Sequence, residues 1–216
     1  MPRKIILLGD SDISRWPSSL HPSIPSAPTV VSNYGKGGAC LVDLLEQIKN
    51  LDQWEINGDG NSGGEADQLF VCCAGENDVG SGRTMEHILD TFSAVLDSLF
   101  PPTNTNQRHE SKMIFFGPKF EPWMTDDNPS RKKYTKLSNG FQRVIRKHRA
   151  CDRIIYIDCL TLFCTKETSS KPGAVYGGRA MPDIQYFDSD GLHLNDAGYG
   201  AWKRIVEVKI AESGST

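Results

Sequence analysis

Four short segments of the chain carry the residue types that serine-based catalysis needs. They are Gly9-Asp10-Ser11, Asn33–Gly38, Gly75–Asp78 and Asp190–His193. A serine hydroxyl becomes a good nucleophile when a neighbouring base takes its proton, and histidine is the base whose pKa suits neutral pH. An aspartate three residues before such a histidine can hold the imidazole in one tautomer. Glycine-rich turns and asparagine amides are the usual donors to a developing oxyanion.

Five short apolar runs predict the strands that position these segments. They are rich in Ile, Val or Phe and apolar on both alternating faces: Lys4–Leu8, Thr29–Ser32, Leu69–Ala74, Met113–Gly117 and Arg153–Leu160. This continuity predicts strands buried on both sides, as in a parallel sheet covered by helices. Because ligands sit outside the carboxyl ends of such strands, we expect the four polar segments to line one rim.

Amphipathic helices are predicted between the runs, from apolar residues at helical spacing in 41–51, 88–99, 134–145 and 197–205. Thr84 is the expected N-cap of the second helix, which Pro101-Pro102 ends. Alternation of strands and helices predicts an α/β fold, a three-layer α/β/α sandwich. No internal repeat or domain boundary is visible, so we expect one domain over residues 1–216.

The composition is that of an ordinary globular protein. Of the 216 residues, 38% are hydrophobic and 24% are charged, and the formal net charge is −3. These values exclude bulk disorder and offer no electrostatic footprint for nucleic acid. The six cysteines show no zinc spacing, and no apolar run approaches the ~20 residues of a membrane span. With no signal-peptide core at the N-terminus, we expect a cytoplasmic protein.

The segment from Arg131 to Arg149 is rich in Lys and Arg and contains no acidic residue. A basic amphipathic helix can dock on an anionic surface. We favour the simpler interpretation, a solvated outer face opposite an apolar stripe, and therefore expect neither nucleic acid nor a membrane surface as a partner.

The four polar segments together resemble the SGNH hydrolases, also called the GDSL esterase/lipase family. The Gly-Asp-Ser block of that family matches Gly9-Asp10-Ser11, and its Asn followed five residues later by Gly matches Asn33 and Gly38. Its Gly-x-Asn-Asp block matches Gly75–Asp78. Its Asp-x-x-His block matches Asp190 and His193. Each block alone is a weak signal, but their order and spacing cover Ile5 to Trp202.

The resemblance implies a flavodoxin-like five-stranded parallel sheet of order 2-1-3-4-5. It also implies hydrolysis of an ester or thioester through an acyl-enzyme, without metal or organic cofactor. Ser11 would be the nucleophile, His193 its base and Asp190 the acid that orients His193. The N–H groups of Ser11 and Gly38 and the side-chain amide of Asn77 would hold the oxyanion. Because the chain has no lid-like insert, we expect a serine esterase for small-molecule esters with short acyl groups such as acetyl.

One position departs from the family pattern. Asp12 stands where the family name records a leucine after the serine. Its carboxylate would disfavour anionic substrates or cap the following helix, and we favour the cap. We expect substrate contacts from Asp12, Trp123 and Tyr186. Other aromatic and Met side chains that could wall a pocket are Trp16, Met124, Tyr176 and Met181.

Several alternatives stay open. The chain could be a thioesterase or lysophospholipase of the same family, or a non-catalytic module that binds a carbohydrate or another ligand on this fold. Asn33–Gly38 lacks P-loop spacing, which argues against nucleotide binding. No Gly-x-Ser-x-Gly elbow surrounds Ser11, which argues against an α/β-hydrolase. Asp188 is a rival to Asp190 for orienting His193, although it lies off the family spacing.

Overall fold

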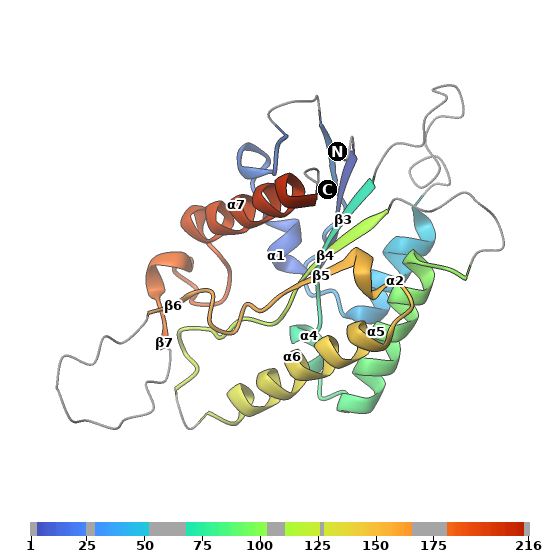
Figure 1. Ribbon diagram of the computed structural model, residues 1–216. Helices are drawn as coiled ribbons and strands as arrows, with labels where there is room; N and C mark the ends of the chain where they lie inside the picture. Colours follow the sequence, from blue (N-terminus) through green and yellow to red (C-terminus); the bar gives the residue numbers. More distant parts are fainter. Residues whose placement is uncertain are drawn as a thin grey trace, which may run out of the picture.

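Five parallel strands form one sheet in the order β2-β1-β3-β4-β5 (Figure 1). The computed structural model describes residues 4–24, 29–51, 68–102, 111–125, 128–165 and 181–213. The strands are β1 (Lys4–Gly9), β2 (Val30–Asn33), β3 (Gln68–Cys73), β4 (Lys112–Phe116) and β5 (Ile154–Ile157). The predicted number, direction and order of the strands are therefore confirmed.

The register of the sheet brings the carboxyl ends of four strands to one edge. Gly9 of β1 is level with Cys73 of β3, Cys73 with Phe116 of β4, and Phe116 with Ile157 of β5. The segments that leave these strands therefore start from one row, as parallel strands require. On the other side of β1, Leu7 is level with Asn33, the last residue of β2.

Helices cover both faces of the sheet (Figure 1). On one face lie α2 (Leu41–Asn50), α5 (Met85–Leu99) and α6 (Pro129–Lys147), packed against Ile6 and Leu8 of β1. On the other face lie the short α1 (Ser11–Ser14) and the long α7 (Asp196–Ser213), packed against Ile5 and Leu7. Alternate residues of β1 thus pack into two separate cores, as the period of two in a strand requires.

Burial on both faces holds for the central strands but not for the edges. Ile5 through Leu8 are fully buried, and all of β3 is buried. In β2, however, Val30 is 61% exposed, and β5 is only partly buried. The expectation that all five strands are buried on both sides was wrong for β2 and β5, because the helices pack over the middle of the sheet.

The helix boundaries follow the expected signals. Thr84 accepts a hydrogen bond from the His87 N–H and caps α5, as predicted. In α6, Tyr134, Leu137, Phe141 and Ile145 are buried, whereas the described lysines at 132, 133 and 136 are exposed. The predicted apolar stripe of this helix is therefore confirmed.

Short elements complete the fold. They are α4 (Glu76–Gly80), η1 (Ser18–Leu20), η2 (Cys151–Arg153), η3 (Ile184–Tyr186), β6 (Cys164–Thr165) and β7 (Met181–Pro182). The two-residue strands β6 and β7 pair antiparallel and were not predicted, since two residues carry no readable period. All six cysteines lie in the described part of the chain and are free thiols. Among the described helices, none is long and apolar enough to cross a membrane.

Candidate active site

Ser11 begins α1 at a sharp turn directly after β1. Gly9 has a φ of 143°, and a Cβ added there would lie 2.0 Å from the carbonyl oxygen of Cys73. Only glycine fits where β1 passes the end of β3. Asp10 caps α1 by accepting a hydrogen bond from the Asp12 N–H at 3.0 Å. Close strand packing and this cap fix the backbone that carries Ser11.

The loop after β2 packs directly against this turn. The side-chain amide of Asn33 donates to the Ile13 carbonyl at 2.8 Å, and its oxygen accepts the Gly35 N–H at 2.9 Å. A Cβ on Gly35 would lie 2.3 Å from the Ser14 nitrogen, so the loop backbone touches α1. Asn33 therefore joins the second polar segment to the serine turn.

The third segment is tied to the second. The Asn77 amide donates to the Ala39 carbonyl at 3.0 Å, one residue beyond Gly38. Gly38 itself has a left-handed φ of 73°. The carboxylate of Asp78 accepts the Leu41 N–H at 2.9 Å, at the start of α2. These contacts hold the loop that carries Gly38 beside the start of α4, which carries Asn77, at the same edge of the sheet.

Asp190 and His193 form a close pair in a tight turn. His193 Nδ1 donates to Asp190 Oδ2 at 2.6 Å, while Asp190 Oδ1 accepts the N–H groups of Leu192 and His193, both at 2.9 Å. The hydrogen bond from His193 is the main reason that the pKa of Asp190 lies far below its usual value. The rival Asp188 instead accepts the Ser189 N–H. With the proton on Nδ1, Nε2 of His193 is the basic ring nitrogen.

Two contacts bring this turn to α1. The Leu194 N–H donates to Asp12 Oδ1 at 3.4 Å, and the Arg15 guanidinium lies 3.5 Å from Asp190 Oδ2. Asp12 directly follows Ser11 in the sequence, and Leu194 directly follows His193. Within the described part of the chain, the Ser11 hydroxyl makes no hydrogen bond to His193. Such contacts are often long in unliganded sites and tighten when substrate binds.

A buried ion cluster beneath the rim was not predicted from the sequence. The Lys119 ammonium lies 2.5 Å from Asp12 Oδ2 and 3.0 Å from Glu76 Oε2, and all three residues are buried. Burial lowers the pKa of Lys119, but the adjoining carboxylates outweigh it, and the pKa lies well above its usual value. The only sequence signal is that acids and a lysine follow the ends of β1, β3 and β4, which does not reveal that they are buried together.

This cluster corrects the expectations for Asp12. Its side chain is buried and paired with Lys119, so it does not face a substrate. It is not the helix cap either, because Asp10 fills that role. The carboxylate is instead half of a buried ion pair.

The expected pocket walls divide into core and surface. Trp16 is 2% exposed and stacks on Tyr199 with ring centroids 6.0 Å apart, and Met124 is fully buried. Both are core residues, so expecting them in a pocket wall was wrong. Trp123 is 52% exposed, and Tyr186 and Met181 are partly buried. Tyr176 lies outside the described residues. Trp123 and Tyr186 remain available for substrate contact.

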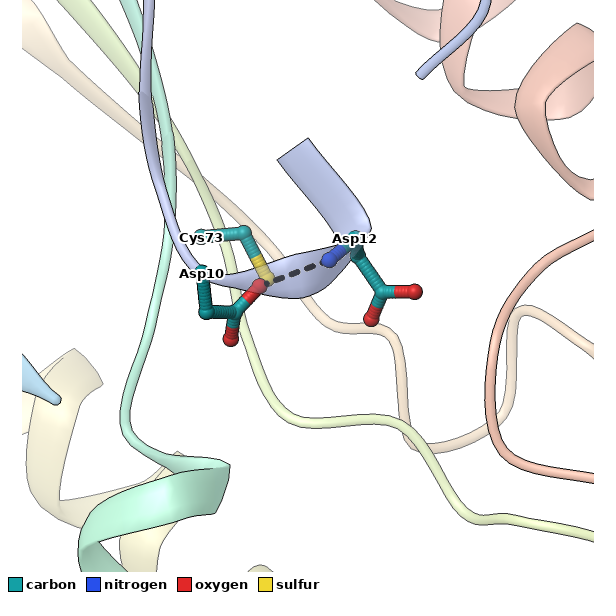
Figure 2. Close-up of side chains that lie close together, drawn as sticks. All are labelled: Asp10, Asp12 and Cys73. Carbon is teal, nitrogen blue, oxygen red and sulfur yellow. Dashed lines mark hydrogen bonds between the residues drawn. The ribbon is translucent and has the colours of Figure 1, made fainter. Parts of the chain in front are cut away.

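A group of donor atoms near Ser11 has metal-like spacing but unsuitable chemistry. Figure 2 shows Asp10, Asp12 and Cys73, whose ligand atoms lie within 4.8 Å of one another. Burial is the main reason that the pKa of the Cys73 thiol is well above its usual value, so in the folded protein this side chain is a buried neutral thiol. One oxygen of Asp10 accepts the Asp12 N–H, and Asp12 faces Lys119. A cation here would compete with a buried ammonium.

A cavity of about 350 Å³ lies beside the second polar segment. It is lined by Tyr34, Lys36, Asp43, Glu46, Gln47, Asn50 and Leu51. Neither Ser11 nor His193 lines it, and its walls belong to α2 and the loop before it. It is therefore separate from the Asp190–His193 pair.

Comparison with known proteins gives the class. The sequence matches the model of the GDSL-like lipase/acylhydrolase family over residues 5–205, so the chain belongs to this family and is a hydrolase. A search of curated proteins found no match.

Solved structures of hydrolases share the fold at low sequence identity. A lipase/acylhydrolase from Enterococcus faecalis has a TM-score of 0.59 and 16% identity, over 96% of this chain and 95% of that one. An acetylxylan esterase from Geobacillus stearothermophilus has a TM-score of 0.62 and 12% identity, over 94% and 91% of the two chains. A G-D-S-L family protein from Veillonella parvula has a TM-score of 0.58 and 16% identity, over 93% and 94%.

Proposed function

We propose that the protein is a serine esterase that hydrolyses small-molecule carboxylic esters through an acyl-enzyme on Ser11. The observation that carries this proposal is the Asp190–His193 pair, held against the turn that presents Ser11. Membership of the GDSL-like lipase/acylhydrolase family supports the same reaction class.

In the first half of the reaction, His193 Nε2 takes the proton of the Ser11 hydroxyl as its oxygen attacks the acyl carbon. Asp190 holds the Nδ1–H tautomer and stabilises the imidazolium that forms. The N–H groups of Ser11 and Gly38 and the free N–H of the Asn77 amide donate to the oxyanion. The imidazolium then gives its proton to the leaving alcohol, and the carbon–oxygen bond to that alcohol breaks.

In the second half, His193 takes a proton from water, whose oxygen attacks the acyl carbon bound to Ser11. The same donors hold the second oxyanion. The proton returns to the Ser11 oxygen as its bond to the acyl carbon breaks, which releases the carboxylic acid and restores the enzyme.

We propose short acyl groups such as acetyl as the preferred substrates. Trp123, exposed on the loop after β4, and Tyr186, in η3, are the side chains proposed to contact them. The acetylxylan esterase that shares the fold acts on an acetyl ester, which is consistent with this size. Activity on p-nitrophenyl esters should fall as the acyl chain lengthens from acetyl. A maximum at eight carbons or more would contradict the short-acyl preference while leaving the serine esterase in place.

The central test is covalent labelling by a fluorophosphonate, followed by intact-mass analysis. We expect one adduct on the wild-type protein, none on Ser11→Ala, and strongly slowed labelling of His193→Ala. Asp190→Asn should also label slowly, because an amide can donate to Nδ1 and favour the wrong tautomer. Asp188→Asn is the matched control and should label at the wild-type rate. Wild-type labelling of Ser11→Ala, or full activity of His193→Ala, would overturn the proposal.

A further inference from the structure

Four segments of the chain meet in one buried cluster around Lys119, and they contribute Asp12, Glu76, Lys119 and Leu194. The Lys119 ammonium contacts Asp12 and Glu76, and its backbone N–H donates to the second oxygen of Glu76 at 2.7 Å. The second oxygen of Asp12 accepts the Leu194 N–H. Lys119, Asp12 and Leu194 are 2–3% exposed and Glu76 is 9% exposed, so the network excludes water.

The two partners of Lys119, and the Leu194 that is hydrogen-bonded to Asp12, each adjoin a proposed site residue in sequence. Asp12 directly follows Ser11, Glu76 directly precedes Asn77, and Leu194 directly follows His193. The serine, oxyanion and histidine turns come from different parts of the chain. The ammonium links the first two directly and the third through the carboxylate of Asp12.

We propose that Lys119 is a positioning residue that sets the distances between Ser11, Asn77 and His193. This inference rests on the proposed function. An ammonium between two carboxylates fixes both by short directional bonds, which an apolar side chain of similar size cannot do. Because proposed reacting groups sit one residue away from these bonds, a shift of the cluster displaces them, and displacement by about 1 Å can cost 10²-fold in rate.

Removing the lysine alone would not separate a loss of positioning from a loss of stability. Lys119→Met leaves two buried carboxylates without a counter-charge, which strongly destabilises a fold. The triple variant Asp12→Asn/Glu76→Gln/Lys119→Met removes all three charges, and both amides keep an acceptor oxygen for Leu194 and the Lys119 backbone. Replacing a whole buried ion cluster by neutral groups is often tolerated. Lys209→Met, which removes a surface ion pair with Glu212, is the control for loss of a lysine.

The test measures unfolding in urea, kcat and KM for an acetyl ester, and fluorophosphonate labelling. We expect the triple variant to unfold near the wild-type midpoint while its kcat and labelling rate are about 10–100-fold lower, with KM nearly unchanged. Lys209→Met should match wild type throughout. If the triple variant recovers both stability and rate, Lys119 is merely structural and the proposal fails. If wild type labels at Ser11 and the triple variant labels equally fast, only the positioning role fails.

A second measurement does not depend on catalysis. Amide hydrogen exchange of segments 10–15, 74–80 and 190–195 should be faster in the triple variant than in wild type, with α5 unchanged as the internal reference. Unchanged exchange in all three segments would overturn the positioning role. It would do so even if no serine reactivity were found, which separates this failure from that of the proposed function.

Discussion

At the scale of single residues, the backbone at position 9 admits only glycine. Replacing Gly9 with alanine should destabilise the protein by about 2–4 kcal/mol, because the new Cβ meets the Cys73 carbonyl at 2.0 Å and φ is 143°. Urea unfolding would measure this loss. Gly37→Ala is the control, since its Cβ meets nothing within 4 Å and should change stability by less than about 0.5 kcal/mol. Equal effects of the two substitutions would contradict the steric argument.

Residue identity predicted the candidate site only in part. Short motifs, which can be recognised without knowing the fold, contain the predicted site residues Ser11, Gly38, Asn77, Asp190 and His193. The role of Lys119 could not be predicted, because its partners lie 107 and 43 residues away along the chain. A charged residue in a loop is normally solvated, and only the fold reveals its burial. The burial of Asp12 could not be predicted from the sequence for the same reason.

At the scale of elements, one side chain ties α2 to the serine turn. The Gln47 amide donates to the Gly9 carbonyl at 3.0 Å, and its oxygen accepts the Gly9 N–H at 2.9 Å. Gln47→Leu should cost about 1–3 kcal/mol, since it leaves backbone groups without this partner. It should also slow fluorophosphonate labelling at Ser11. Exposed Glu46, the adjacent residue, is the control, and Glu46→Leu should leave both quantities near wild type. Full stability and reactivity of Gln47→Leu would show that the contact is dispensable.

The elements themselves were largely predictable, and the errors have physical causes. Central strands such as β1 and β3 are apolar throughout because helices cover both of their faces. The edge strand β2 has the same apolar letters but leaves Val30 exposed, since β-branched residues favour strands wherever they lie. The pairing of β6 with β7 joins two segments that are far apart in the sequence and leaves no local pattern.

At the scale of the whole molecule, the buried carboxyls make stability depend on pH. Burial, reinforced by Glu76, raises the pKa of Glu121 to about 8, whereas an unfolded glutamate titrates near ~4.3. Between these values the unfolded chain has released a proton that the folded chain still holds. The contribution of protonated Glu121 to the free energy of unfolding is therefore fully present below the unfolded pKa. It is lost as the pH rises through about 8.

Glu121→Gln tests this dependence, because the amide keeps an acceptor for the Trp123 N–H and carries no charge. Relative to wild type, the variant should gain at least about 1 kcal/mol in free energy of unfolding between pH 5 and pH 8. Urea titrations at each pH would measure the gain. Glu86→Gln, which removes an exposed carboxyl, is the control and should change the free energy of unfolding by less than about 0.5 kcal/mol. A difference for Glu121→Gln that does not vary with pH would contradict a buried, protonated carboxyl.

The distribution of thiols gives the molecule a natural attachment point. Burial is the leading cause of the raised pKa of five cysteines, namely Cys40, Cys72, Cys73, Cys159 and Cys164. Cys151 alone among the six is exposed. It lies in η2, at the amino end of β5, whereas the rim with Ser11 lies at the carboxyl ends of the strands. A maleimide dye or solid support would therefore couple at Cys151 and leave the edge that carries Ser11 facing the solution.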